Sequence, residues 1–149
     1  MTKEEKQLLI KDLCGRLLYG VKICVDGYIC TLLDINTEMG DKLNGETFHT
    51  VGFNKPNGDY NFCTISEVKP YLRPMSSMTD EEYNEYNKED DLDVKDSAET
   101  LKANLKAKSR VRISKWYHGT DWLNAHHFDY RGLIENGLAI EAPEEMYNN

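Results

Sequence analysis

The segment from Val21 to Leu32 constrains the fold more than any other part of the chain, because apolar residues recur at every second position in it. The pair Asp26-Gly27 at its centre is typical of the two-residue type I′ turn of a β-hairpin. Such a turn makes the residues that face each other across the hairpin share one side of the sheet. The side chains on that side are apolar: Val21, Ile23, Val25, Tyr28, Cys30 and Leu32. The segment therefore predicts an antiparallel hairpin with one buried side.

A second strand pair is predicted at residues 48–54 and 60–65, around Pro56-Asn57-Gly58. A turn at Asn57-Gly58 places Phe53 opposite Phe62. Residues 36–46 are polar, contain two glycines and are typical of a long exposed loop. Four short strands in so few residues predict a small four-stranded antiparallel sheet, either flat or bent into an SH3-like barrel.

Thr2 and Glu5 form a capping box that predicts the start of a helix over residues 3–15. Its apolar stripe is expected to pack on the sheet, and it consists of Leu9, Ile10, Leu13, Cys14 and Leu17. The chain has four cysteines and no C-x-x-C pair, so they are interpreted as buried hydrophobic residues in a reducing compartment.

Residues 67–74 are expected to form a helical turn and an extended exit from the sheet, because Pro70 and Pro74 disfavour a central strand. Thr79 and Glu82 form a second capping box, which predicts a short helix that carries Tyr83 and Tyr86.

The charge pattern then changes along the chain. Residues 80–96 are mainly acidic, whereas residues 102–115 contain basic residues and no acidic ones. A duplex-mimicking surface and a phosphate-binding strip are two interpretations, but a solvated linker beside a helix is favoured. Residues 110–114 resemble an edge strand, which would make a homodimer reasonable.

The segment 116–134 contains both tryptophans of the chain and many ionisable side chains. Thr120 or Asp121 can cap one short helix, and Asp129 can cap a second that ends at Gly137. We therefore expect an α+β fold of three parts: a helix with a β domain (1–78), a charged helical linker (79–109), and a strand with a two-helix corner packed on the first part (110–149).

The candidate binding residues all lie in this C-terminal segment: Trp116, Trp122, His126, His127, Asp129, Tyr130 and Arg131. Large aromatic side chains beside an arginine are typical of interaction hot spots, but also of a small core. His126, His127 and Asp129 could instead form a metal or general-base cluster. Adjacent helical histidines point about 100° apart, and no H-E-x-x-H spacing is present. We therefore assign no catalytic residue, no metal and no cofactor.

The net charge of -8 disfavours general attraction to nucleic acid or to an anionic membrane surface. No apolar run approaches the ~20 residues that span a bilayer, and the polar start is unlike a signal peptide. The sequence predicts a cytoplasmic protein that does not enter membranes.

Three blocks of the sequence carry a resemblance: MTKEEKQLL, KDLC and YGV within residues 1–21, KPYLRPMSSMT at residues 69–79, and DWLNAHHFDYRGLIENGLAIEAP at residues 121–143. They are similar to a family of uncharacterised small proteins that gut Bacteroidales bacteria encode, often in prophage or phage-like regions. The resemblance implies an accessory protein of a mobile element that engages a host or phage protein. We expect a non-enzymatic binding protein; the alternatives are a small-ligand or nucleic-acid binding module and a metal-assisted hydrolase.

Overall fold

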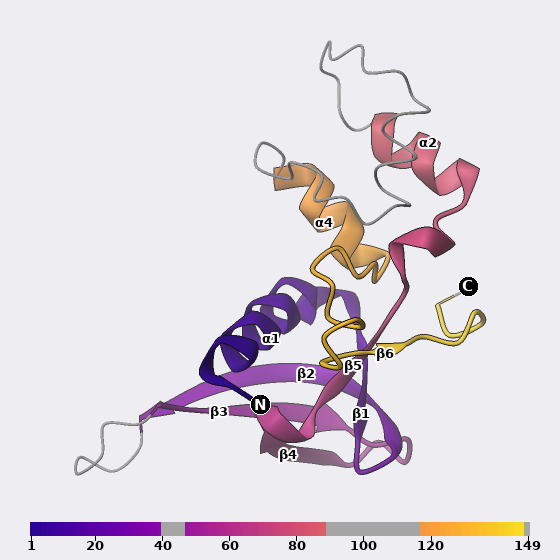
Figure 1. The fold of residues 1–149 in the computed structure, drawn as a ribbon. Helices are drawn as coiled ribbons and strands as arrows, with labels where there is room; N and C mark the ends of the chain where they lie inside the picture. The colour runs from indigo at the N-terminus through magenta and orange to yellow at the C-terminus, as the bar shows by residue number, and fades with distance from the viewer. Residues whose placement is uncertain (40–46, 89–116, 148–149) are drawn as a thin grey trace.

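The computed structural model describes residues 1–39, 47–88 and 117–147, and it has an α+β fold with a six-stranded mixed sheet (Figure 1). The strand order is β4-β3-β2-β1-β5-β6, in which only β5 and β6 are parallel. The strands are β1 (Lys22–Val25), β2 (Tyr28–Met39), β3 (Thr47–Asn54), β4 (Tyr60–Thr64), β5 (Lys69–Leu72) and β6 (Ile140–Glu141). The α-helices are α1 (Lys3–Arg16), α2 (Asp80–Lys88) and α4 (Tyr117–Ala125), and three 3-10 turns are η1 (Leu17–Tyr19), η2 (Ile65–Glu67) and η3 (Met75–Ser77).

The predicted first hairpin is confirmed. Val25 pairs with Tyr28 and Ile23 pairs with Cys30. Asp26 and Gly27 both have positive φ angles, 51° and 81°, as a type I′ turn requires. The expected buried side is formed except at Tyr28, which lies at the end of the hairpin and is 60% exposed.

The second hairpin has a different register from the predicted one. Phe53 pairs with Asn61, and Phe62 pairs with Gly52, one position away from the expected Phe53–Phe62 pair. The connection is a longer loop, closed by a hydrogen bond of 3.0 Å from the Lys55 N–H to the Asp59 carbonyl. A two-residue turn would place Pro56 in the closing pair, where it has no N–H to donate. The shift leaves Phe62 72% exposed.

The sheet is open and has six strands, so the predictions of four strands and of an SH3-like barrel are wrong. Residues 36–39, expected in a loop, continue β2. Pro70 lies within β5, paired with Ile23 of β1, although a strand was not expected there. It is tolerated because β6 pairs only with Tyr71 and Leu72, beyond the proline.

Helix α1 covers one face of the sheet, and α2 and α4 lie on the far side of α1, away from the strands (Figure 1). The capping box at Thr2 is confirmed, but the buried stripe of α1 is rotated from the expected one. Cys14 is exposed, and the buried positions include two charged residues, Asp12 and Arg16. The cysteines as a group are therefore not buried, and all four are free.

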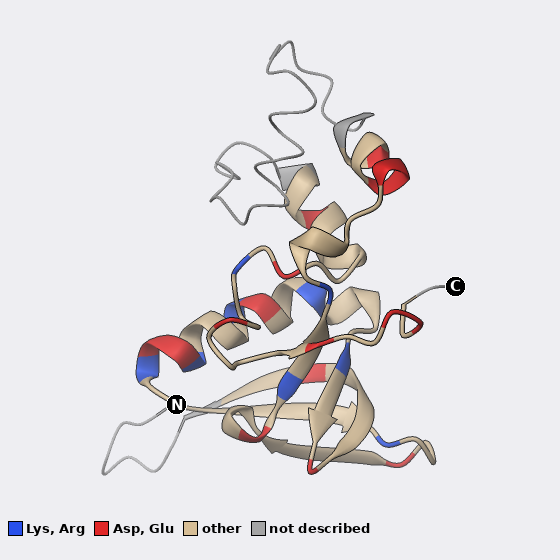
Figure 2. Ribbon diagram, turned by 45° about the vertical axis from the view of Figure 1, so that its right-hand side comes forward, with Lys and Arg blue, Asp and Glu red and all other residues tan. Residues whose placement is uncertain are grey.

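Two hydrophobic cores result from this arrangement. The sheet core, between α1 and the sheet, contains mainly aliphatic side chains: Leu9, Leu13, Val21, Ile23, Val25, Cys30, Leu32, Val51, Phe53, Ile65, Val68, Leu72, Leu133, Leu138 and Ala139. The helical core, between α2 and α4, is rich in aromatic and methionine side chains: Met75, Met78, Tyr83, Tyr86, Trp122, Leu123 and Phe128. The acidic first turn of α2 lies on the outer side of this second core (Figure 2).

The C-terminal part is a helix followed by turns, so the prediction of a two-helix corner is wrong. Helix α4 begins at Tyr117, so Thr120 and Asp121 lie inside it and do not cap it. The Asp129 carboxylate does accept the backbone N–H groups of Leu133 and Ile134, both at 2.8 Å. Gly137 has a φ of 69° and ends this turn as predicted. Asp129 caps the start of this segment and Gly137 ends it shortly before β6, so the segment forms only a single turn.

The predicted edge strand at 110–114, the charge block at 102–115 and most of the predicted linker lie outside the described residues. Within the parts of the chain that the structure describes, no helix is long and apolar enough to cross a membrane.

Candidate ligand-binding groove

A groove lies where η1, the segment after β5, helix α2, the end of α4 and the C-terminal tail meet. Its volume is about 740 Å³, which is within the usual range for small-molecule sites. Most of its lining is polar, and it consists of Tyr19, Arg73, Glu82, Ala125, His126, His127 and Tyr147.

His127 is the most unusual residue of the groove. Its side chain is only 6% exposed, and its backbone has a φ of 60°, a left-handed conformation that is strained for histidine. Two hydrogen bonds fix this conformation: the His127 N–H donates to the Asn124 carbonyl (3.1 Å), and the Arg73 N–H donates to the His127 carbonyl (2.8 Å). The buried Nδ1 atom has no hydrogen-bond partner among the described residues.

The imidazole of His127 is held neutral. Burial, followed by the positive charges of Arg16, His126, Arg73 and Lys22, lowers the pKa of His127 to about 4. The His127 ring stacks on the Tyr147 ring, with 3.9 Å between the ring centres. His127 therefore offers a neutral, pre-positioned hydrogen-bonding group at the wall of the groove.

His126 points its ring onto a different partner. Its ring stacks on Trp122 with 3.8 Å between the ring centres, and its Nδ1 lies 2.9 Å from the Trp122 carbonyl oxygen. A carbonyl oxygen can only accept, so Nδ1–H donates this hydrogen bond. Both histidines thus line the groove, although the His126 ring stacks on Trp122 and the His127 ring stacks on Tyr147.

Arg73 and Glu82 form the third polar feature of the groove. Two guanidinium nitrogens of Arg73 donate to the two Glu82 oxygens, at 2.6 and 2.9 Å. Burial alone would raise the pKa of Glu82, but hydrogen bonds from Arg73 and from the Thr79 N–H lower it overall. The Arg73 guanidinium also lies 4.3 Å from the centre of the Phe128 ring. Glu82 is therefore ionised and already paired.

Tyr147 lines the groove and contacts the sheet through Lys22 and Tyr71. Its hydroxyl accepts the Lys22 N–H (3.0 Å) and donates to the Tyr71 carbonyl (2.9 Å). Burial raises the pKa of Tyr147 to about 12. The Tyr147 hydroxyl therefore stays protonated near neutral pH, and the side chain lines the groove without acting as an acid.

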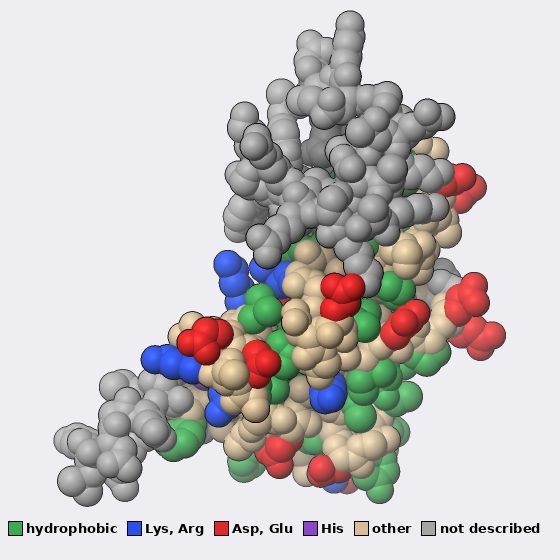
Figure 3. Space-filling model, viewed as in Figure 1, with side chains coloured by type: hydrophobic (Ala, Val, Ile, Leu, Met, Phe, Trp, Pro, Cys, Tyr) green, Lys and Arg blue, Asp and Glu red, His purple; other side chains and the backbone are tan. Residues whose placement is uncertain are grey.

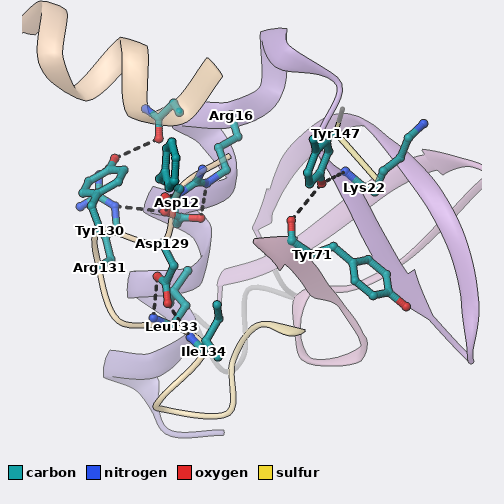
Figure 4. Close-up of polar contacts among 12 residues, drawn as sticks. Asp12, Arg16, Lys22, Tyr71, Asp129, Tyr130, Arg131, Leu133, Ile134 and Tyr147 are labelled. Atoms are coloured by element: carbon teal, nitrogen blue, oxygen red, sulfur yellow. Dashed lines mark hydrogen bonds and ion pairs between the residues drawn. The ribbon is translucent and has the colours of Figure 1, made fainter. Parts of the chain in front are cut away.

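Behind the groove, α1 contributes a buried ion pair (Figure 4). Asp12 and Arg16 are both 0% exposed, and the Arg16 Nε donates to an Asp12 oxygen at 2.7 Å. Arg16 also donates to the Phe128 carbonyl (2.8 Å), and Arg131 approaches the same carboxylate at 3.2 Å. One carboxylate thus serves two guanidinium groups.

Tyr130 and Asn124 complete this polar network. The Tyr130 hydroxyl donates to the Asn124 side-chain oxygen (3.0 Å) and accepts from Arg131 (2.9 Å). Asn124 lies against Gly15 of α1, where a β-carbon would come within 2.9 Å of its amide nitrogen. Gly15 is therefore needed for the close approach of α1 and α4.

The structure divides the predicted site residues between two places. His126 and His127 line the groove, and Trp122 supports His126 from the helical core. Tyr130 and Arg131 belong to the buried network, and Asp129 holds the turn that follows it. Trp116 lies outside the described residues.

Several residues of the groove and network were not predicted from the sequence. Arg73 was placed only in an extended exit from the sheet and Glu82 only in a capping box, and no role was assigned to Tyr147, Asp12 or Arg16. The pair Asp12 and Arg16 left one signal: opposite charges four positions apart, in register with Leu9 and Leu13.

The three residues of the metal hypothesis do not converge. The Asp129 carboxylate is taken by backbone N–H groups, and the two histidine rings stack on different partners. Within residues 1–39, 47–88 and 117–147, no group of three or more histidine, cysteine or acidic residues could hold a metal ion.

Cysteine chemistry finds no support either. Burial, together with the charge of Glu67, raises the pKa of Cys63 to about 11, and desolvation raises the pKa values of Cys30 and of the partly covered Cys14 thiol. These thiols are therefore protonated and weakly nucleophilic near neutral pH.

Comparisons with protein-family models, with curated proteins and with solved structures found no match to this chain.

Proposed function

We propose that the chain is a non-enzymatic binding protein of a mobile element and that the groove beside His127 holds its ligand. The observation that carries the proposal is His127, which lines the polar groove: it is nearly buried and strained, and its buried Nδ1 has no hydrogen-bond partner among the described residues. A strained conformation persists only where its surroundings hold it, and such residues cluster at functional sites.

The sequence blocks that carry the resemblance add support. Tyr19 belongs to the first block, Arg73 to the second, and Ala125, His126 and His127 to the third. Segments that lie far apart in the chain thus meet around one groove. If the family shares this groove, its members would bind their ligands there.

A thermal-shift screen with small polar metabolites tests the proposal. A ligand that binds only the folded chain stabilises it by about 2.7 kcal/mol at a hundredfold excess over its Kd. We expect at least one compound to raise the Tm of the wild type and to be recovered unchanged after incubation.

Two variants locate the binding. Ala125→Trp places a large side chain in the groove, and Leu18→Ala changes a residue that is 90% exposed and does not line it. A groove ligand should lose its effect on Ala125→Trp and keep it on Leu18→Ala. Equal shifts for both variants, or chemical conversion of the compound, would refute the proposal.

A second candidate function, contact with a host or phage protein, is favoured by the outer face of the sheet. Large apolar side chains are exposed at Phe62 (72%), Tyr60 (54%) and Phe48 (51%). Hydrophobic side chains also reach the surface over the lower part of the molecule, where the sheet lies (Figure 3). Exposed apolar patches of this kind mark interaction surfaces.

A photo-crosslinking residue at position 62, compared with one at position 18, tests this candidate. A specific partner should crosslink from position 62 alone, and Phe62→Ser should weaken its binding. Equal crosslinking from both positions would indicate nonspecific contact and would refute the sheet face as a partner site.

A further inference from the structure

The charges around His127 identify the kind of ligand that the groove suits. Besides burial, the groups that depress its pKa are Arg16, His126, Arg73 and Lys22, all of which are cationic or can become so. A positive potential at the imidazole is unexpected in a chain with a net charge of -8. It is therefore a local property of this site.

The nearby carboxylates do not cancel this potential. Asp12 is shared between Arg16 and Arg131, so one negative charge faces two positive ones. The Nη1 atom of Arg16 is buried and has no hydrogen-bond partner among the described residues. Because Asp12 is shared between two guanidinium groups, it is not a full counter-ion for Arg16.

The other two acidic groups are also engaged. Glu82 lines the groove, but both of its oxygens accept hydrogen bonds from Arg73. Asp129 turns its carboxylate onto the N–H groups of Leu133 and Ile134 (Figure 4). Neither carboxylate is free to serve His127 as a counter-ion.

We propose that the groove takes a ligand with an anionic group, a carboxylate or a phosphate, which lies against His127 and His126. This inference rests on the proposed function and adds the ligand class to it. The anion supplies a counter-charge for the cationic groups around His127 and a hydrogen-bond acceptor for an imidazole N–H. The volume of about 740 Å³ leaves room for the rest of a metabolite-sized molecule.

Protonation of His127 is then coupled to binding. An anion beside the ring favours the imidazolium form, so a bound ligand raises the pKa of His127 from about 4. By linkage, the affinity rises as the pH falls through the pKa of the bound state and levels off below the pKa of the free state. A ligand held without an anionic group would show no such coupling.

The test follows the imidazole ring signals of His127 by NMR, with inorganic phosphate and succinate as separate probes and glycerol as the neutral control. We expect one anion to give saturable shifts below about 10 mM and to raise the His127 pKa by at least one unit. Phosphate and succinate distinguish the two chemical sources of the charge. Glycerol should have no effect.

The matched variant is His127→Asn, because asparagine tolerates the left-handed backbone and lacks the imidazole. Its affinity for the active anion should fall at least tenfold, whereas Leu18→Ala should bind as the wild type does. If neither anion shifts the His127 signals and a neutral metabolite binds the groove with a pH-independent Kd, the anion inference fails and the proposed function stands. If no compound binds through the groove, both fail.

Discussion

The two cores of this protein are organised by different means. In the sheet core, the backbone pairing of neighbouring strands decides which side chains are buried. In the helical core and the groove beside it, the positions of the helices and turns depend on contacts between residues far apart in the sequence. One example is the hydrogen bond from the Arg16 side chain to the Phe128 carbonyl. The first region is stabilised by buried apolar area, whereas the second also contains buried charges and a strained histidine beside the candidate groove.

The largest expected effect comes from the buried ion pair. Asp12→Ala leaves the guanidinium groups of Arg16 and Arg131 without their carboxylate, and we expect the free energy of unfolding to fall by about 3–5 kcal/mol. Urea denaturation followed by circular dichroism measures it. Glu4→Ala, in the exposed first turn of the same helix, is the control and should change little. A small effect of Asp12→Ala would mean that the network is not buried.

Truncation within each core compares the two regions directly. Leu123→Ala in the helical core should cost about 2–5 kcal/mol, and Val51→Ala in the sheet core less, because fewer atoms are removed. Both residues are 0% exposed. Hydrogen exchange shows whether the losses are local. If Leu123→Ala accelerates exchange in α2 and α4 while β1 to β3 stay protected, the two cores are separate cooperative units; uniform acceleration would make them one.

The third effect depends on pH. The pKa of His127 is about 4 in the folded chain and ~6.5 when unfolded, so between these values only the unfolded chain takes up the proton. The free energy of unfolding should therefore fall by roughly 2 kcal/mol from pH 7 to pH 4, after allowance for partial solvent screening. His127→Asn should remove this component. Identical pH profiles for the wild type and the variant would show that His127 is not held neutral.

The smallest effect is expected on the outer face of the sheet. Phe62 is 72% exposed, so Phe62→Ser should change the free energy of unfolding by no more than about 0.5 kcal/mol. Anion binding in the groove should also be unchanged. A large loss of stability would place Phe62 in the sheet core, in the register that the sequence predicted with Phe53 as its partner.

The same contrast explains what could be predicted from the sequence. The hairpin at Asp26-Gly27 and the capping boxes at Thr2 and Thr79 depend on neighbouring residues, and all three are confirmed. The second register was wrong because one proline changed the length of a turn. Local rules are therefore reliable only where the turn itself is defined.

The site could be predicted only in part. His126 and His127 were selected for their composition, and the structure does place both in the groove. Arg73, Glu82 and Tyr147 reach it from segments whose local patterns predict secondary structure at most and give no sign of a shared groove. The burial of Asp12 and Arg16 depends on Phe128 and Arg131, more than a hundred positions away, and no local pattern contains that information.

The hydrogen bonds of Tyr147 also imply an order of assembly. The hairpins join residues close in sequence and can form early, whereas the contact between Lys22 and Tyr147 spans 125 positions and that between Arg16 and Phe128 spans 112. Contacts that close such long loops are entropically costly and form late. The groove should thus mature after the sheet, and a ligand specific for it would report on chains that have completed folding.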